Sequence, residues 1–160
     1  MISECSKWLI SVALGLTICA GAQAEGPPKS SLTIAPAEMQ WKPSARVPGV
    51  VTVDFIGSGA GAGTGQYVYR VKFPPQFKMQ AHGHPDERTY VVMSGTIYIG
   101  WGEKFDEGKL KALPSGSYWV EPAHVLHFLT TKDEVAVLHI TGTGPTAVNY
   151  VDPAHAPAKK

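Results

Sequence analysis

Short apolar runs, broken by glycine and proline, recur along most of this chain. Valine, isoleucine, tyrosine and threonine are frequent in these runs, and the 160 residues include 17 glycines and 13 prolines. Short runs of this composition, separated by turn residues, are typical of antiparallel sheets. The runs that we expect to form strands are Leu32–Ala35, Met39–Lys42, Val50–Ile56, Tyr67–Phe73, Lys78–His84, Thr89–Met93, Thr96–Trp101, Ser117–Val120, His127–Thr131 and Val135–Thr141. Their spacing predicts an all-β fold, an antiparallel sandwich or barrel.

Two segments between these runs have a different character. Residues Lys104–Ala112 have a short helix-like pattern, but a glycine interrupts it, so we expect two turns at most. Residues Gly57–Gly65 are rich in glycine and are followed by a strand. A phosphate-binding loop would need Gly-Lys-Ser/Thr and a helix at this point, so the glycine run is better interpreted as a hairpin loop.

Histidines provide the most evident chemistry in the sequence. His82 and His84 are two residues apart in a predicted strand, and side chains at this spacing point to the same face of a sheet. His127 begins another apolar run further along the chain. Three imidazoles could therefore meet one metal ion. A His-x-His pair alone is a weak signal, because a histidine in a strand is more often an ordinary core or surface residue.

The residues around these histidines strengthen the interpretation. Their order resembles the two sequence motifs of the cupin superfamily, in which His-x-His, a glutamate and a glycine are followed by Pro-x-Gly and a third histidine. The matching residues are His82, His84, Gly95, Pro114, Gly116 and His127. The resemblance spans residues 66–141. It implies a single-domain, cupin-like antiparallel β-barrel, or jelly roll, that holds one divalent transition metal. A site rich in imidazole suits Fe, Ni, Cu or Zn, and Mn fits less well without a carboxylate.

The chain departs from the cupin pattern at the glutamate. Counting back from Gly95 places Arg88 at that position, while Glu87 is one residue out of register and would face the other side of the strand. A bulge at Asp86 could turn Glu87 or Asp86 inward as a fourth ligand. We favour a three-histidine site in which Arg88 points inward and anchors a substrate carboxylate. The alternative is a surface arginine paired with its acidic neighbours.

Three further residues are candidates for a role near the site. Tyr90 shares strand parity with Arg88, so it could donate a proton or hydrogen bond to a substrate, or pack as an ordinary aromatic residue. His124 stands where the cupin turn more often has glycine, and it is either a proton shuttle or a turn residue. His139 lies in an apolar run. If it points inward, it could contact a metal ligand or be a fourth ligand, and otherwise it is a core histidine satisfied by hydrogen bonds.

The first 24 residues have the pattern of an export signal. Lys7 precedes an apolar run from Trp8 to Ala20, and Ala22-Gln23-Ala24 is a small-x-small cleavage pattern. We therefore expect Glu25 to be the first residue of the mature protein. The mature protein is expected in the periplasm or outside the cell.

The remaining chain predicts one domain. Residues 25–150 suffice for a single cupin-like domain, and the proline- and alanine-rich residues 151–160 predict a disordered tail. Both cysteines, Cys5 and Cys19, lie in the predicted signal. Disulfides, thiolate ligands and a cysteine nucleophile are thereby excluded from the mature domain.

The net charge of the chain limits the kinds of partner that we expect. The net charge is +1 and the basic residues are scattered, which argues against nucleic acid or a membrane surface as a partner once the signal is cleaved. A small-molecule substrate or ligand remains, and the cupin resemblance implies a homodimer. The leading hypothesis is a metal-dependent dioxygenase, isomerase, decarboxylase or lyase, since the fold does not decide among these. The alternatives are a non-catalytic protein that binds a small ligand or metal, and a structural or degenerate cupin that binds no metal.

Overall fold

The computed structural model describes residues 31–58 and 63–157. The described residues from 35 to 157 belong to one compact unit, and residues 31–34 belong to a separate one. The predicted export signal, residues 1–24, therefore lies outside the described residues. Among the described residues, no helix has the length and apolar character needed to cross a membrane.

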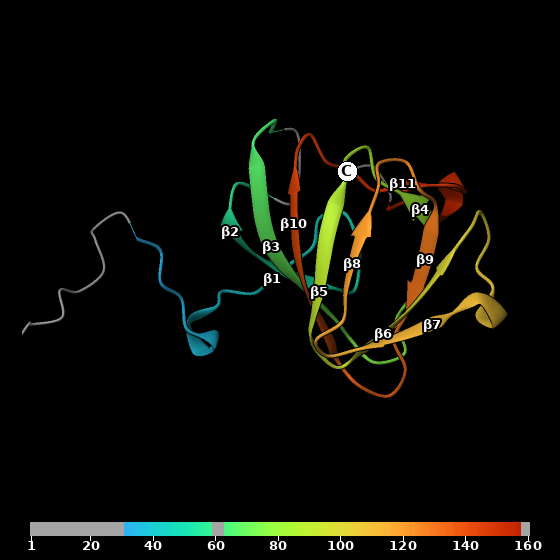
Figure 1. Cartoon of the computed structure of the whole chain (residues 1–160), viewed down its shortest axis with the longest axis horizontal. Helices are drawn as coiled ribbons and strands as arrows, with labels where there is room; N and C mark the ends of the chain where they lie inside the picture. The colour runs from blue at the N-terminus through green and yellow to red at the C-terminus, as the bar shows by residue number, and fades with distance from the viewer. Residues whose placement is uncertain (1–30, 59–62, 158–160) are drawn as a thin grey trace, which may run out of the picture. The chain divides into compact units, whose positions relative to one another are not determined.

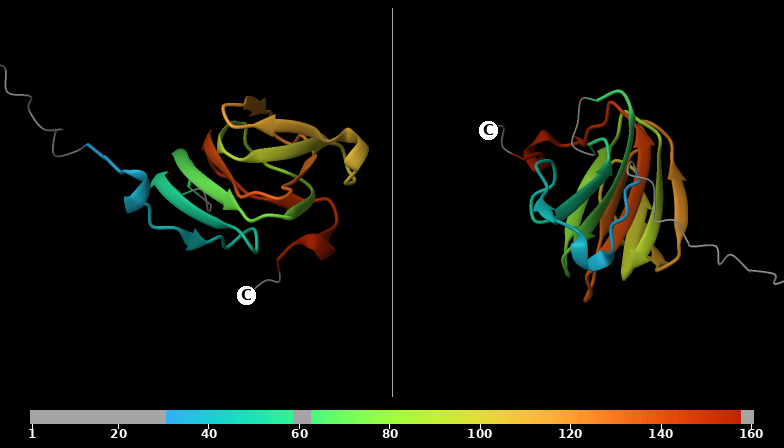
Figure 2. Two further views of the ribbon diagram at one scale, coloured as in Figure 1. Left: turned by 90° about the horizontal axis from the view of Figure 1, so that it is seen from below. Right: turned by 90° about the vertical axis from the view of Figure 1, so that its left-hand side faces the viewer.

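Two antiparallel sheets face each other in the compact unit (Figures 1 and 2). The six-stranded sheet has the order β1 (Lys42–Pro43), β2 (Val51–Ile56), β3 (Gln66–Phe73), β10 (Ala136–Thr143), β5 (Arg88–Ser94), β8 (Tyr118–Glu121). The five-stranded sheet has the order β11 (Asn149–Tyr150), β4 (Lys78–Gly83), β9 (His127–Thr130), β6 (Thr96–Trp101), β7 (Lys111–Pro114). Three short 3-10 helices, η1 (Pro36–Glu38), η2 (Glu107–Lys109) and η3 (Pro153–His155), complete the described elements. The predicted all-β antiparallel fold is confirmed.

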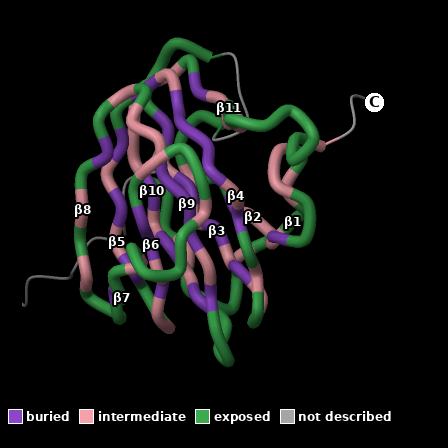
Figure 3. Tube along the Cα trace, turned by 90° about the vertical axis from the view of Figure 1, so that its right-hand side faces the viewer, coloured by how far each residue is buried: buried purple, intermediate pink, exposed green. Residues whose placement is uncertain are grey.

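The core lies between the sheets because the strands alternate between an inner and an outer face. On β3, Tyr67, Tyr69, Val71 and Phe73 are buried and the residues between them are only partly so. Similar alternation marks β5 and β10, and buried positions lie on strands of both sheets in Figure 3. This inner face carries the residues of the candidate site.

The strands predicted from Val50 onward are confirmed, with ends that differ by at most two residues. The prediction over Leu32–Ala35 is wrong: no strand forms there, and Leu32 is 62% exposed. Of Met39–Lys42, only Lys42 belongs to a strand, β1. Neither run presents the alternating buried face that holds a strand in a sheet.

In the segment predicted to be helix-like one short helix forms, η2, which Asp106 caps through its side chain. The strand β7 begins at Lys111, inside the same segment. The pairing of β7 with β6 and the burial of Leu113 explain this difference, because tertiary packing overrides a weak helical pattern. At the other end of the chain, β11 pairs with β4, with Tyr150 opposite His82. The tail that composition predicted to be disordered carries η3.

The glycine run links β2 and β3, which pair as antiparallel neighbours. This pairing agrees with its interpretation as a hairpin loop. Residues 59–62 within it lie outside the described residues.

Candidate functional site

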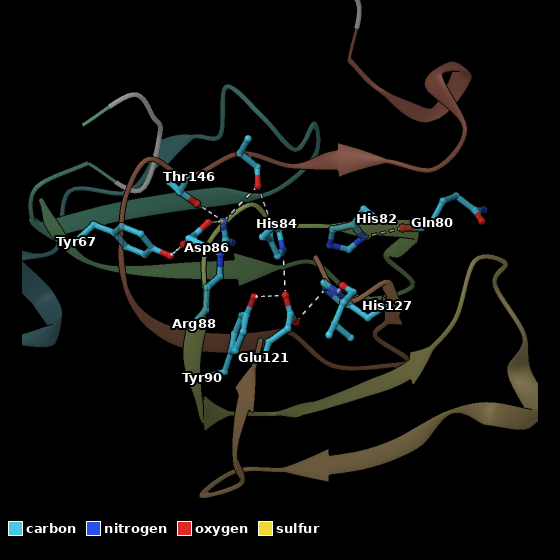
Figure 4. Close-up of polar contacts among 12 residues, drawn as sticks. Tyr67, Gln80, His82, His84, Asp86, Arg88, Tyr90, Glu121, His127 and Thr146 are labelled. Atoms are coloured by element: carbon cyan, nitrogen blue, oxygen red, sulfur yellow. Dashed lines mark hydrogen bonds and ion pairs between the residues drawn. The ribbon is translucent and has the colours of Figure 1, made fainter. Parts of the chain in front are cut away.

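Three histidines meet on the inner face of the five-stranded sheet (Figure 4). His82 lies on β4, His84 follows the end of that strand, and His127 begins β9 directly opposite His82. Their exposed fractions are 1%, 4% and 2%. The intervening Gly83 leaves room for this arrangement, since a Cβ there would lie 3.2 Å from the carbonyl oxygen of Val125. The structure thus brings together the three histidines that the sequence singled out.

Backbone carbonyls orient all three rings. The Nδ1 atoms of His82 and His84 lie 2.7 Å and 2.6 Å from the carbonyl oxygens of Gln80 and Ala147. The Nδ1 atom of His127 lies 3.5 Å from the carbonyl oxygen of Val125. A carbonyl can only accept, so Nδ1 carries the hydrogen and Nε2 keeps its lone pair. Carbonyl support of this kind is typical of histidines that bind a metal.

A buried carboxylate, Glu121, completes the group. It is the last residue of β8 and is 2% exposed. Its Oε2 lies 3.3 Å from Nε2 of His127, and its Oε1 lies 3.6 Å from Nε2 of His84. Sequence reasoning missed this residue, because the predicted strand ended at Val120 and the cupin motif places its glutamate elsewhere. The one available signal was its strand parity with Trp119.

Burial shifts the pKa values of the whole group. It lowers the pKa of His82 to about 4 and brings the pKa values of His84 and His127 well below their ordinary value. It also raises the pKa of Glu121 to about 8. The imidazoles are therefore neutral at pH 7, which is the form that binds a metal, and Glu121 holds a proton that a metal ion would displace.

The donor set fits a divalent transition metal. Each histidine offers one nitrogen, and these nitrogens lie within 4.8 Å of one another. The Oε2 atom of Glu121 is buried and has no hydrogen-bond partner among the described residues. Two ligands on one tetrahedral ion with bonds of ~2.0–2.1 Å are about 3.3 Å apart. The separations of Glu121 from His84 and His127 are close to that value, so an ion shared by these side chains would satisfy the unpartnered oxygen.

Arg88 points into the barrel, as we expected, and is 2% exposed. Its Nε and Nη2 donate to Asp86 at 3.3 Å and 3.2 Å, and Nη2 also donates to Thr146 Oγ1 and to the carbonyl oxygen of Ala147. Tyr67 donates its hydroxyl to the same aspartate. These protein groups already occupy much of the guanidinium fork, which corrects the expectation that Arg88 is free to anchor a substrate carboxylate.

Tyr90 lies on the same inner face of β5 as Arg88. Its hydroxyl is 3.5 Å from Oε1 of Glu121, and its ring stacks on Trp119 at 4.4 Å with an interplanar angle of 2°. Burial raises its pKa well above the ordinary value, so the phenol keeps its proton. Tyr90 can therefore donate a hydrogen bond toward the carboxylate of the site.

Three other candidates lie away from the histidine group. Glu87, expected as a possible metal ligand, is exposed, as its register predicts for a residue facing outward. His124 is also exposed, has a positive φ of 65°, and donates its backbone N–H to the carbonyl oxygen of His84. The structure thus supports the turn-residue alternative for His124. His139 faces the outer side of β10, where its ring lies 6.2 Å from that of Phe55.

A cavity of about 50 Å³ lies between the sheets and reaches the histidines. A single water needs roughly 10–15 Å³ on this measure, so the cavity holds a ligand of only a few non-hydrogen atoms. The lining includes both polar and apolar residues, and apolar side chains form most of the wall surface. The polar residues that bear on the site are His82, His84, Arg88, Tyr90, His127, Ser44 and Arg46. The last two were not among the candidates, because they precede both motifs.

Solved structures with the same fold have low sequence identity to this chain. The polyketide cyclase RemF from Streptomyces resistomycificus has a TM-score of 0.62 and 16% identity, over 76% of this chain and 86% of its own. An RmlC-like cupin from Shewanella frigidimarina has a TM-score of 0.54 and 16% identity, over 72% and 92%. The DMSP lyase DddQ from Ruegeria pomeroyi has a TM-score of 0.56 and 20% identity, over 71% and 61%. No curated protein matches the chain.

These likenesses confirm the predicted jelly-roll fold. A family model, described as the ChrR cupin-like domain, matches residues 29–147. The matched region contains the three histidines, Glu121, Arg88 and the whole wall between them apart from Val148. The resemblance to cupins that the two motifs indicated is thereby confirmed, and the chain belongs to the family of ChrR cupin-like domains.

Proposed function

We propose that this protein is a metal-dependent enzyme that acts on a small organic anion in the cavity between its sheets. One observation carries the proposal: three buried histidines that line a mainly apolar cavity converge on one point, and the carboxylate of Glu121 lies beside two of them. A divalent transition metal bound there would supply Lewis acidity or redox chemistry. With a carboxylate in the donor set, Mn fits as well as Fe, Ni, Cu or Zn.

The residues of the chain have distinct roles in this proposal. His82, His84 and His127 hold the metal through Nε2, while backbone carbonyls fix their orientation. Tyr90 supplies a proton donor beside Glu121. The apolar wall excludes water, which strengthens each electrostatic interaction inside the cavity. Arg88, which is held by its ion pair with Asp86, forms part of the cavity wall on β5.

Two structural neighbours support an enzyme rather than a non-catalytic protein, because one is named a cyclase and another a lyase. We propose the same reaction classes as the motifs implied: dioxygenase, isomerase, decarboxylase or lyase. A dioxygenase requires a redox-active metal, whereas the other classes need only a Lewis acid. The identity of the bound metal therefore separates these classes.

The test measures metal in the protein purified without a histidine tag, by inductively coupled plasma mass spectrometry. The wild type should hold about one transition metal per chain, and a His82→Ala, His84→Ala double variant should lose it. Glu87→Gln is the matched control, because this acidic residue is exposed and outside the group. Absence of metal from the wild type, even after reconstitution with each candidate ion, would contradict the proposal.

A non-catalytic metal-binding protein is the second candidate, and the number of protein donors favours it. Four protein ligands fill a tetrahedral ion, whereas catalytic sites usually keep a position open. Cobalt substitution distinguishes the two functions through the visible spectrum. A spectrum that changes when a small anion is added indicates an open position, while a four-coordinate spectrum that no added ligand alters would favour the binding protein.

We also propose that the protein is exported, on the basis of the leader pattern in residues 1–24. Cell fractionation of the full chain tests this, with mass spectrometry of the N-terminus. A mature protein beginning at Glu25 outside the cytoplasm is the expected result, and an intact leader in the cytoplasmic fraction would contradict it.

A further inference from the structure

A second arginine, Arg46, also lines the cavity, and it lies far from Arg88 in the sequence. It lies in the loop between β1 and β2, outside both cupin motifs, and it reaches the same cavity as the histidines. Val47 beside it also lines the cavity and packs against the core. The loop therefore forms part of the wall of the candidate site.

Hydrogen bonds hold this loop in shape. The Oγ of Ser44 accepts from the backbone N–H of Arg46 at 3.3 Å and from that of Val47 at 3.2 Å. The backbone N–H of Ser44 donates to the carbonyl oxygen of Val50 at 3.0 Å. Val50 is itself 2% exposed and belongs to the core. Arg46 thus extends from a turn that is anchored at both ends, and its side chain is positioned before any ligand arrives.

One nitrogen of the partly buried Arg46 guanidinium lacks a hydrogen-bond partner among the described residues. This nitrogen, Nη1, is buried, and none of the ion pairs among the described residues includes it. Arg88, by contrast, is neutralised by Asp86 and donates to three protein groups. A buried donor without a partner is unfavourable unless a ligand accepts from it. The two arginines of the cavity therefore differ: Arg88 is held by several protein groups, whereas Arg46 keeps a buried Nη1 donor without a partner among the described residues.

We propose that Arg46 anchors the carboxylate of a short-chain aliphatic substrate, and this inference rests on the proposed function of the same site. The planar fork of a guanidinium matches a carboxylate. The cavity of about 50 Å³ admits only a few non-hydrogen atoms beyond it. Apolar residues of the wall then contact the chain of the substrate; they include Val50, Val71, Leu129, Leu138 and Ile140. A monoanion suits this cavity because a phosphate would bring a larger and more strongly hydrated group into an apolar wall.

Butyrate is the probe, and butyramide is its uncharged match. Isothermal titration calorimetry on the metal-loaded full chain should show that butyrate binds the wild type and that butyramide binds at least about tenfold more weakly. Arg46→Gln should weaken butyrate binding by about tenfold or more, and Arg46→Lys, which keeps the charge but loses the fork, should lie between them. The metal content of each variant should equal that of the wild type.

Arg70→Gln is the matched control, since this arginine lies on the outer side of β3 near Phe55 and is absent from the cavity wall. It removes the same charge and should leave butyrate binding unchanged. Equal butyrate affinity in Arg46→Gln and the wild type would overturn the inference. So would a metal-loaded wild type that binds none of the linear carboxylates from acetate to valerate.

The two proposals fail in different ways. If the protein holds no metal but binds butyrate through Arg46, the proposed function is wrong and the anchor is supported. If the metal is bound normally and butyrate binding does not depend on Arg46, the anchor is wrong and the metal site stands.

Discussion

Arg88 and Glu121 lie directly opposite each other on neighbouring strands, β5 and β8. Both side chains face the interior, and each is 2% exposed. Cβ atoms of directly opposed residues are only about 4.5–5.5 Å apart. Glu121 on β8 can therefore reach the same part of the site that a glutamate at position 88 of β5 would reach. The site keeps an acidic donor next to its histidines although the motif position holds an arginine.

Glu121→Gln should weaken metal binding by about 10- to 100-fold, because the amide cannot supply the negative charge of the carboxylate while the three imidazoles remain. Competition with a chelator of known affinity measures the change. Glu87→Gln again serves as the control for loss of one acidic residue. Unchanged affinity in Glu121→Gln would mean that the histidines bind the metal without this carboxylate.

Asp86→Asn should destabilise the protein by about 3–5 kcal/mol, because it leaves the buried guanidinium of Arg88 without a counter-charge. The side chains of the pair are only 5% and 2% exposed, so solvent screens their interaction little. Urea denaturation measures the free energy of unfolding. In the double variant Asp86→Asn, Arg88→Met, part of the loss should be recovered, since no unpaired charge remains. A loss below about 1 kcal/mol in Asp86→Asn would show that water or another group compensates for the arginine.

Stability of the metal-free protein should have a maximum near neutral pH. Burial lowers the pKa of His82 to about 4, so below pH 6.5 the unfolded chain binds more protons and acid destabilises the fold. Burial raises the pKa of Glu121 to about 8 from an ordinary 4.5. Between pH 4.5 and about pH 8 the folded protein binds more protons at Glu121 than the unfolded chain does. The contribution of Glu121 to stability is therefore lost as the pH rises through this range.

Urea denaturation of the metal-free protein from pH 5 to pH 9 tests this dependence. In Glu121→Gln the decline on the alkaline side should disappear, while the acid-induced decline from the histidines remains. The same alkaline decline in the wild type and the variant would contradict the assignment to Glu121.

The fold was predictable because it depends on local alternation. From Val50 to the end of β10, apolar residues alternate with polar ones and turns are marked by residues such as Gly95, whose φ is +71°. The errors occurred where no such pattern exists. Leu32–Ala35 is apolar but has no sheet to join, and β7 and β11 are short strands defined by their partners, β6 and β4.

The site was predictable only in part, for a similar reason. The histidines carry a motif, whereas Glu121 belongs to the site because β8 pairs with β5, and sequence spacing does not reveal that pairing. Arg88 is buried, as we expected from its place at the motif position of the glutamate. Its role depends on Asp86, Thr146 and Ala147, and two of these come from a distant loop after β10. Arg46 joins the site by the same kind of long-range contact.

His124→Gly should stabilise the protein by roughly 0.5–1 kcal/mol. The residue has a φ of 65°, a conformation that costs an L-residue with a Cβ roughly 1–2 kcal/mol and costs glycine little, although glycine loses more entropy on folding. The backbone hydrogen bond of residue 124 to the carbonyl oxygen of His84 is kept in the variant, at 2.7 Å in the wild type. Because His124 is exposed and is not part of the histidine group, metal content should not change. Thermal unfolding gives the stability, and His124→Ala, which keeps the Cβ and loses the imidazole, should show no gain. If His124→Gly instead lost metal or unfolded more easily, the side chain of His124 would contribute to the site and not only to the turn.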